Sequence, residues 1–338
     1  MKHRIIHLAE QDVWERELSG MRYLPAHTWH YCKAMAESSR LDTALYVETS
    51  NEKKIICPFS VRSKEKGYRE IVSPYGFGGV LSTEMRHGGA ASLGSWEDFW
   101  RQNDVVTAYI MQHPLCRISA EGGDECVKES HPLFCIDLQL PEEELWRNMH
   151  STHRYEIRRG EKDSGIEISI DDEELKHALL VLYPQTLERI QASKIYYFRQ
   201  STLETLMNMR HAFLVGAVSG TTVHAVSLFL YTEHGAEYFL NAATLEGRKF
   251  SRTLLWAAIR ELKKRAVPFL NLGGGVRPGD SLEDFKRRFG GKMLCAQTLR
   301  QIFDRDKYTY LMKYCEAGDA HGYFPPYWKE KQDMESVA

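Results

Sequence analysis

The chain has 338 residues, of which 43% are hydrophobic and 27% are charged, so it is long enough and apolar enough to bury the cores of about two domains. This composition excludes a disordered or fibrous protein, and no run approaches the roughly 18 uncharged apolar residues of a membrane span. The N-terminal segment lacks the apolar core of a signal peptide and the seven cysteines form no CxxC pair; we therefore expect a cytoplasmic protein with reduced thiols.

Charge is distributed unevenly along the chain, although the net charge is only −2. Residues 248–313 carry 16 Lys and Arg against 6 Asp and Glu, a net charge of +10, whereas residues 141–247 carry 10 against 16, a net charge of −6. A basic segment of this kind attracts polyanions such as nucleic acid, a nucleotide or a phosphorylated substrate. A solvated basic helix face accounts for it equally well.

The first half of the chain alternates strand-like and helix-like segments. Apolar and β-branched residues predict paired strands over residues 43–49 and 53–63, joined by a polar turn at Ser50–Glu52. A third strand follows from residue 68 and runs into a Pro/Gly loop at Pro74–Gly79. The aromatic and apolar spacing from Ser95 to His113 predicts a helix that begins with a capping-box-like Ser95 and Asp98.

The second half repeats this order of elements. Pro141 opens an acidic helical turn, and the predicted elements after it are a basic helix at Ser151–Lys162, a strand at 166–170, a helix at Glu173–Arg189, strands at 211–219, 222–232 and 236–244, a helix at Ser251–Arg265, a strand running into the glycine turn at 269–275, and a short helix from Asp280 or Ser281. We therefore expect a mixed α/β fold with two domains, residues 1–140 and 141–315, and a C-terminal tail at 316–338.

Three strands followed by a helix that is entered through a phosphate-sized turn is the plan of the GNAT superfamily of acyl-CoA-dependent N-acetyltransferases. In those enzymes a loop of the pattern [Arg/Gln]-x-x-Gly-x-[Gly/Ala] opens the helix and holds the CoA pyrophosphate with bare amides. The corresponding residues are Arg248, Lys249, Phe250, Ser251, Arg252 and Thr253. Ser251 and Thr253 stand where the glycines belong, and their side chains crowd a pyrophosphate, while Arg248, Lys249 and Arg252 supply cations for donor phosphates. An ordinary N-cap at Ser251 explains the same residues without any ligand.

Four segments together resemble the Fem-type aminoacyltransferases, which build peptidoglycan interpeptide bridges and belong to the GNAT superfamily. They are SPYGFGG at Ser73–Gly79, the run at Ser151–Ile168, the run at Leu245–Ile259, and FLNLGGGVRPGDSLEDFKRRFGGK at Phe269–Lys292. They span roughly residues 20–313 in the order of that family. The chain departs from some staphylococcal members because no coiled-coil arm interrupts its second half.

The resemblance implies tandem GNAT-like domains, each a mostly antiparallel mixed sheet flanked by helices, with a cleft between them. It also implies transfer of an aminoacyl group from aminoacyl-tRNA to an amine of a cell-envelope precursor, a sugar nucleotide or a small natural product. The donor is then a substrate, aminoacyl-tRNA or acyl-CoA, and no bound cofactor or metal is expected. The expected partners are tRNA and a phosphorylated or nucleotide-linked acceptor.

The resemblance also assigns roles to particular residues. Phe285 and Lys286 match the Phe-Lys pair beside the tRNA acceptor end, where Lys286 places a positive charge near the oxyanion of the tetrahedral intermediate. The residues implied to face the acceptor are Thr186, Arg189, Tyr196, Tyr197, Tyr75 and Trp29. The same residues also have purely structural interpretations. Lys286 is then a surface lysine of an amphipathic helix, Arg189 is an arginine on a helix surface, and the aromatic rings pack in the core.

Other chemistries have weaker support in the sequence. The pairs His27-x-x-His30 and His150-x-x-His153 lack the neighbouring ligands of a zinc site. No nucleophile is compelling, since Cys295 has no recognisable activating group, so direct attack by the acceptor amine is the simpler mechanism, assisted by a carboxylate such as Asp280 or by a substrate phosphate. Two alternatives stay open: an acyl-CoA-dependent N-acyltransferase that acts on an amino sugar in surface-polysaccharide synthesis, and a non-catalytic protein that binds a phosphorylated ligand.

Overall fold

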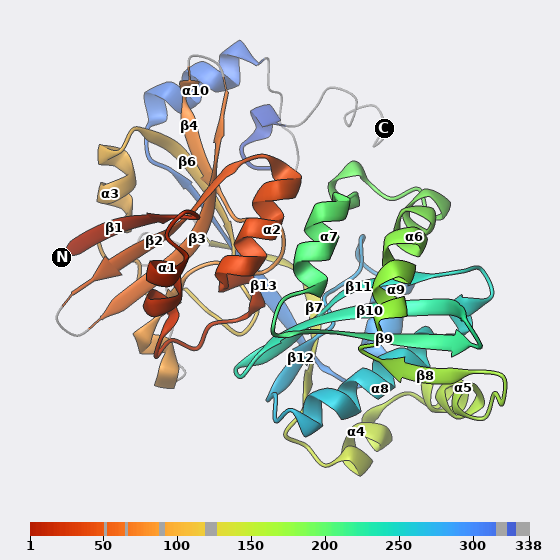
Figure 1. Ribbon diagram of the computed structural model, residues 1–338. Helices are drawn as coiled ribbons and strands as arrows, with labels where there is room; N and C mark the ends of the chain where they lie inside the picture. Colours follow the sequence, from red (N-terminus) through yellow and green to blue (C-terminus); the bar gives the residue numbers. More distant parts are fainter. Residues whose placement is uncertain (51–52, 65–66, 88–91, 119–126, 316–322, 329–338) are drawn as a thin grey trace. The chain divides into compact units, whose positions relative to one another are not determined.

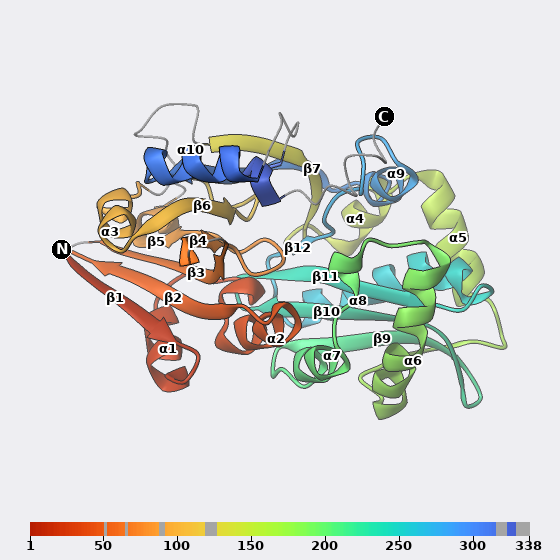
Figure 2. The same ribbon diagram turned by 90° about the horizontal axis from the view of Figure 1, so that it is seen from above.

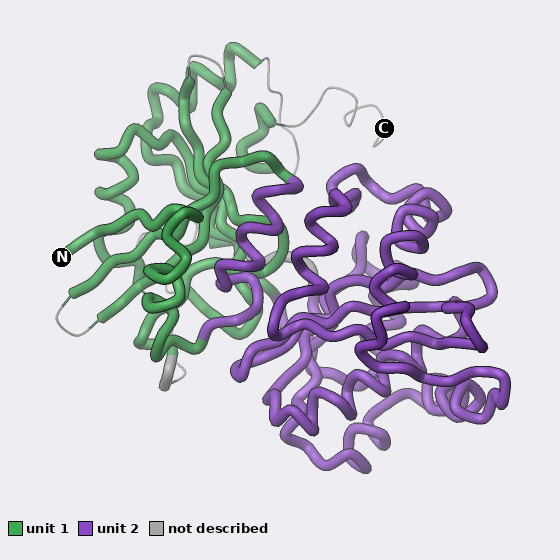
Figure 3. The backbone as a smooth tube through the Cα atoms, in the orientation of Figure 1, with its two compact units in different colours: residues 1–22, 39–130, 296–338 green, residues 23–38, 131–295 purple. Residues whose placement is uncertain are grey.

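The computed structural model describes the chain except residues 51–52, 65–66, 88–91, 119–126, 316–322 and 329–338. The chain forms two compact units (Figure 3): unit 1 comprises Met1–Arg22, Ser39–Ser130 and Ala296–Ala338, and unit 2 comprises Tyr23–Ser38 and His131–Cys295. The assignment to a unit changes after residues 22 and 38 and again within two strands, β7 (Val127–Asp137) and β13 (Lys292–Ile302). These units divide the chain at other places than the expected boundaries at residues 140 and 315.

Unit 1 is built on a mostly antiparallel sheet with the strand order β1-β2-β3-β4-β6-β13, in which β4 and β6 are parallel and β5 pairs with β3. Its strands are β1 (Lys2–His7), β2 (Asp42–Thr49), β3 (Lys54–Ser63), β4 (Arg69–Val72), β5 (Leu81–Ser82) and β6 (Val105–Met111). Its helices are α1 (Gln11–Leu18), α3 (Trp96–Gln102) and α10 (Arg305–Tyr314), with 3-10 turns η3 (Thr83–His87) and η6 (Pro326–Trp328). Figure 2 shows α10 lying alongside β6.

The helix predicted over Ser95–His113 is wrong in its second half. Helix α3 ends at Gln102, Asp104 adopts a positive φ of 57°, and Val105–Met111 form strand β6. The run VVTAYIM is rich in β-branched and aromatic residues, which favour a strand, and it pairs with both β4 and β13. The apolar residues between Ser95 and His113 fitted a helical spacing because α3 and β6 each bury one apolar face.

The C-terminal segment of unit 1 closes on a buried carboxylate. Glu70 of β4 is fully buried and accepts hydrogen bonds from the Tyr327 hydroxyl and the Trp328 indole nitrogen. Arg62 Nε donates to the same carboxylate at 3.0 Å, and its guanidinium lies over the Trp328 ring. Lys64 Nζ also donates to the Tyr327 carbonyl at 2.6 Å. Three groups therefore satisfy one buried charge, and Lys64 fixes one of them.

In unit 2 the strands follow the order β7-β12-β11-β10-β9-β8, and among the described pairings of these strands only β11–β12 is parallel. Its strands, besides the ends of β7 and β13, are β8 (Glu167–Ile170), β9 (Ala212–Ser219), β10 (Thr222–Thr232), β11 (Gly235–Ala243) and β12 (Phe269–Asn271). Its helices are α2 (Trp29–Ser39), α4 (Glu142–Asn148), α5 (Ser151–Glu161), α6 (Glu173–Arg189), α7 (Gln200–Met207), α8 (Ser251–Lys264) and α9 (Ser281–Arg287), with 3-10 turns η1 (Pro25–His27), η4 (Lys194–Tyr196) and η5 (Gly247–Phe250).

Helices cover both faces of this sheet. Figure 1 shows α6 and α7 on one face and α8 on the other. The apolar face predicted for α8 is confirmed, because Leu254, Leu255, Ala258, Ile259 and Leu262 are all at most 1% exposed. Burial of such side chains contributes about 1.5–3 kcal/mol each. The mixed α/β fold with mostly antiparallel sheets is therefore confirmed, and β9, β10, β11 and α8 follow in the predicted order.

Residues 23–38 belong to unit 2 although they lie near the N-terminus. The Thr202 hydroxyl of α7 donates to the Ala34 carbonyl of α2 at 3.0 Å and lies 2.8 Å from the Ser38 hydroxyl. The ring of Tyr31 packs edge-on against Phe239 of β11. None of the described helices of either unit combines the length and the hydrophobicity needed to cross a lipid bilayer.

Candidate active site

A buried amide and a half-buried carboxylate meet where β11 and β12 run parallel. The ladder pairs Glu237 with Asn271, the last residue of β12. Asn271 is fully buried, and its Nδ2 donates to Glu237 Oε2 at 2.9 Å while its Oδ1 accepts from the Gly273 amide at 2.9 Å. A buried amide beside a half-buried carboxylate is costly unless the two groups are paired. Their pairing here fixes the start of the glycine turn.

The glycine turn needs its glycines for two physical reasons. Gly273 has a φ of +72°, which L side chains rarely adopt. A Cβ on Gly274 would lie 2.4 Å from the Pro132 carbonyl oxygen of β7. The backbone therefore packs directly on β7 and turns its carbonyls toward the next helix.

Helix α9 begins with the capping residue that the sequence predicts. Asp280 Oδ1 accepts from the Glu283 amide at 2.7 Å, and its Oδ2 accepts from the Val276 and Arg277 amides at 2.7 and 2.9 Å. These backbone hydrogen bonds hold the pKa of Asp280 below its usual value. A carboxylate occupied in this way positions the loop and is a poor proton acceptor. The general-base role considered for Asp280 therefore has no support in this geometry.

Lys286 points from α9 back to the glycine turn. Its ammonium donates to the Gly274 carbonyl oxygen at 2.9 Å, and a Cβ on Gly273 would lie 3.0 Å from its Nζ. Burial lowers the pKa of Lys286 to about 8, although the charges of Asp280 and Glu237 oppose this shift. The pKa of Lys286 therefore lies close to neutral pH, and its ammonium lies beside the glycine turn.

His153 of α5 connects three helices behind this site. Its Nδ1 accepts from Arg252 Nε of α8 at 3.1 Å, and its Nε2 lies 2.9 Å from the Phe285 carbonyl oxygen of α9. Since a carbonyl oxygen only accepts, Nε2 carries the proton and the ring is neutral. Burial, with the nearby positive charges of Arg252 and Arg288, lowers the pKa of His153 to about 4. His153 thus positions α9 and does not exchange protons at neutral pH.

This neutral histidine predicts a pH-dependent stability. The unfolded chain protonates His153 near pH 6.5 and the folded chain only near pH 4, so the unfolded state binds more protons between these values and stability falls as the pH falls through them. We expect His153→Gln to lose less stability than the wild type between pH 7.5 and 5, by about 2 kcal/mol. Urea unfolding at both pH values measures the difference, with His177→Gln, an exposed site, as the control. Equal losses in the wild type and in His153→Gln would show that His153 is not held neutral.

The predicted donor-phosphate residues lie at the start of α8, but α5 and the turn after it occupy most of them. Lys249 Nζ pairs with Asp163 at 3.2 Å, and the Ser251 hydroxyl donates to the Arg248 carbonyl at 3.1 Å. Arg252 is bound to His153, while Arg248 is exposed. Thr253 is buried, and a Cβ on Gly160 of α5 would lie 2.2 Å from its hydroxyl oxygen. The helix start is therefore packed under α5.

Four of the residues predicted to line an acceptor site lie on α6 or in the segment that follows it. Arg189 Nη2 and the Thr186 hydroxyl both donate to the Ala243 carbonyl at the end of β11, at 2.8 and 3.3 Å. The Tyr183 hydroxyl donates to the Tyr196 carbonyl, and the Tyr197 side chain is 42% exposed.

The two remaining acceptor predictions lie in different units. Trp29 begins α2 in unit 2, with Lys33 Nζ 5.0 Å above its ring. Tyr75 is a half-buried residue of unit 1. Phe285 packs against the rings of His153 and Phe289 in the core of unit 2 and so supports the position of Lys286.

Sequence analysis missed Glu237, Asn271 and the connecting role of His153. A signal was present, because Glu237 and Asn271 are the polar members of otherwise apolar strand segments, AEYFLNAA and FLN. Cysteine chemistry finds no support at this site: burial and the charge of Glu237 raise the pKa of Cys135, so it is held as a thiol. Among the described residues no group of histidines, cysteines and carboxylates has the arrangement of a metal site.

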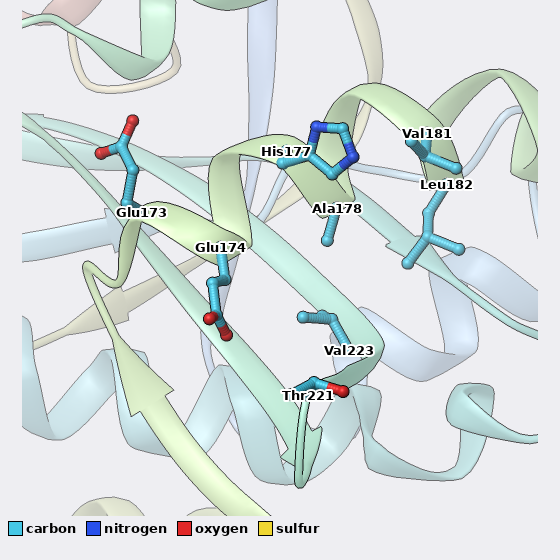
Figure 4. A pocket seen from close by; sticks show the side chains of 8 residues that line it. All are labelled: Glu173, Glu174, His177, Ala178, Val181, Leu182, Thr221 and Val223. Atoms are coloured by element: carbon cyan, nitrogen blue, oxygen red, sulfur yellow. The ribbon is translucent and has the colours of Figure 1, made fainter.

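Two surface hollows lie elsewhere on unit 2. Figure 4 shows one of about 590 Å³, lined by α6 residues that include Glu173, Glu174 and His177 and by Thr221 and Val223 at the β9–β10 hairpin. The other, of about 510 Å³, is lined by Tyr155, Arg158, Arg159, Lys162 and Asp163. The first presents carboxylates and aliphatic groups, whereas the second is rich in cations.

The fold of the chain is also found in solved structures. The chain is similar to FemX, with a TM-score of 0.64 and 12% identity over 92% of this chain and 99% of FemX. It is also similar to L-PGS from Bacillus licheniformis, with a TM-score of 0.56 and 11% identity over 92% of this chain and 96% of that one. The C-terminal domain of a putative lysylphosphatidylglycerol synthetase from Agrobacterium fabrum gives a TM-score of 0.55 and 14% identity over 91% and 96%.

The expected resemblance to Fem-type proteins is confirmed at the level of the fold. No protein-family model and no curated protein sequence matches the chain. Because fold is retained long after function has changed, the chemistry has to be argued from the site.

Proposed function

We propose that this protein is an aminoacyltransferase that moves an aminoacyl group from aminoacyl-tRNA to an amine of a cell-envelope precursor, a sugar nucleotide or a small natural product. The observation that carries the proposal is Lys286: a half-buried ammonium held on the Gly274 carbonyl beside a glycine turn. A fixed cation in a poorly hydrated site stabilises an oxyanion far more than one in water. The likeness of the fold to FemX supports the same assignment.

The proposed reaction is a direct displacement. The neutral acceptor amine attacks the ester carbonyl carbon, a C–N bond forms, and Lys286 donates a hydrogen bond to the resulting oxyanion. When the oxyanion collapses, the C–O ester bond breaks, and the departing tRNA oxygen takes up the proton that the attacking nitrogen loses. A carboxylate carries this proton from nitrogen to oxygen, and we assign this step to Glu237, which is oriented by Asn271.

An aminoacyl-ester assay tests the proposal without knowledge of the acceptor. tRNA charged with a mixture of labelled amino acids is incubated with the purified protein and hydroxylamine, a small generic amine, and amide formation is followed. We expect acceleration that depends on the protein and on Lys286. Consumption of acetyl-CoA without any acceleration on aminoacyl-tRNA would overturn the proposal in favour of an acyl-CoA enzyme.

The packing at the start of α8 argues against CoA as the donor. Helix α5 covers this helix start through the contact of Gly160 with Thr253, the contact of His153 with Arg252, and the ion pair of Lys249 with Asp163 in the turn that follows. Bare amides for a pyrophosphate are therefore not available there.

Restoring the glycines should consequently not create a CoA site. We expect Ser251→Gly with Thr253→Gly to bind CoA no better than the wild type and to lose about 2 kcal/mol of stability, because two helix positions become glycine and a buried side chain is lost. Calorimetric titration with CoA and urea unfolding measure the two effects. A gain in CoA affinity would show that the two side chains, and not α5, were the obstacle.

A further inference from the structure

Most cations of the basic segment 248–313 have internal partners. Ion pairs join Lys249 to Asp163, Arg260 to Glu142 and Glu161, Lys264 to Glu261, Arg265 to Glu261 and Asp171, both Arg287 and Arg288 to Asp284, and Lys307 to Asp104 and Asp304. Hydrogen bonds join Arg252 to His153 and Lys263 to the carbonyls of Leu138 and Leu140. Much of the positive charge counted in the sequence is therefore engaged in contacts within the folded chain.

Helix α5, which lies in the acidic part of the sequence, carries a group of exposed cations. Tyr155, Arg158, Arg159 and Lys162 lie at positions i, i+3, i+4 and i+7 and so share one side of the helix. We call these four residues the α5 basic face. Over the part of the chain that the structure describes, the side chains of Arg158, Arg159 and Lys162 make no ion pair or hydrogen bond with another residue. Tyr155 is 63% exposed, and the four side chains border the 510 Å³ hollow.

The opposite side of α5 is fixed to the rest of unit 2. His153, Ile157 and Gly160 are buried against α8 and α9, and Arg154 Nη1 donates to the Arg147 carbonyl at the end of α4 at 2.9 Å. Arg158 lies over the Trp146 ring, with its guanidinium carbon 5.2 Å from the centroid. The α5 basic face is thus presented on a rigid helix.

This face is also connected to the proposed active site. Figure 2 shows α5 and α9 side by side, and the 2.9 Å contact of His153 with the Phe285 carbonyl joins the first turn of α5 to the residue before Lys286. From Tyr155 to Lys162 the helix rises about 10 Å. A bound strand that follows this face toward the first turn of α5 therefore approaches α9 and Lys286.

We propose that the α5 basic face binds the single-stranded 3′ end of the donor RNA and its neighbouring phosphates. Exposed cations beside an exposed aromatic ring are the combination that holds single-stranded nucleic acid, the cations through phosphates and the ring through base stacking. The inference rests on the proposed function, which requires an RNA-linked donor. It adds the surface on which that donor lies, and that surface is outside the segment singled out by its charge.

The test measures RNA affinity and catalysis separately. Binding of uncharged tRNA and of a hairpin carrying only an acceptor stem with its 3′ overhang is measured by fluorescence anisotropy between 50 and 300 mM salt. The variants are Arg158→Gln with Arg159→Gln and Lys162→Gln, and Tyr155→Ala alone. The control replaces three exposed cations from other places, Arg16, Arg210 and Lys264, with Gln and so has the same net charge.

We expect the triple α5 variant to lower the slope of log affinity against log salt by about 2, because three phosphate contacts are lost. Tyr155→Ala should weaken binding of the overhang hairpin about tenfold and should affect a blunt hairpin much less. The control variant should retain wild-type affinity and slope. Circular dichroism confirms that each variant is folded, and exposed substitutions of this kind change stability little.

The outcomes separate the two proposals. If transfer to hydroxylamine occurs and the α5 variants bind RNA like the control, the α5 inference is overturned and the proposed function stands. If neither RNA binding nor transfer occurs, the proposed function fails, and the α5 inference fails with it. Binding of the wild type to phosphatidylglycerol vesicles but not to RNA, lost in the triple variant, would overturn the RNA assignment and identify a lipid surface instead.

Discussion

Replacement of Lys286 by Met should lower the rate of aminoacyl transfer by about 10²- to 10³-fold, the usual effect of removing one oxyanion-stabilising group. Folding should not suffer. The pKa of Lys286 is about 8 in the folded chain and 10.5 when unperturbed, so between these values the unfolded state binds more protons and stability rises with pH. The charged form therefore opposes folding below pH 8, and a neutral Met at this position should leave the melting temperature equal or slightly higher.

The pH profile distinguishes this electrostatic role from simple packing. In the wild type we expect the rate to fall above about pH 8 as Lys286 loses its proton. Lys286→Arg, which stays charged, should lose this alkaline limb even if its maximal rate is lower. Arg287→Met, on the exposed side of the same helix, is the matched control and should behave like the wild type. Wild-type turnover in Lys286→Met would remove Lys286 from the mechanism.

Replacement of Glu70 by Gln should lower the stability of unit 1 by about 3–5 kcal/mol, because it leaves the charge of Arg62 without its buried partner. A loss of this size corresponds to a decrease of roughly 10 °C in the melting temperature of a unit of this length. Calorimetry and urea unfolding measure it. The C-terminal residues Tyr327 and Trp328 lose an ionic acceptor in the same variant.

Two further variants test whether the broken ion pair causes this loss of stability. Glu97→Gln removes an exposed partner of Arg101 and should cost less than about 1 kcal/mol. Glu70→Gln combined with Arg62→Met removes the unpaired charge and should recover much of the stability. If Glu70→Gln alone is as mild as Glu97→Gln, the C-terminal segment does not close on a buried ion pair.

Several parts of the site could be predicted because their causes are local. Asp280 caps α9 since its carboxylate reaches the amides that follow it in the chain, and Gly273 turns since glycine tolerates a positive φ. The apolar face of α8 follows from the spacing of its own residues. Lys286 could be singled out by resemblance, but its hydrogen bond to Gly274 and its lowered pKa come from the folded site.

Contacts between distant segments decided the rest. Residues 105–111 form a strand because β4 and β13 lie on either side of them, and no local pattern contains those neighbours. Glu237 meets Asn271 only through the parallel register of two strands. Residues 23–38 join unit 2 through contacts such as that of Ala34 with Thr202.

The charge distribution shows the same division. The composition of residues 248–313 shows how many cations there are, but hydrogen bonds and ion pairs with distant residues decide which of them stay exposed. Among the residues that the structure describes, Arg158, Arg159 and Lys162 have no ion-pair partner, although the net charge of their segment is negative. Counting charge along the chain cannot reveal this, because ionic attraction acts through space and depends on which side chains the fold brings within a few ångströms.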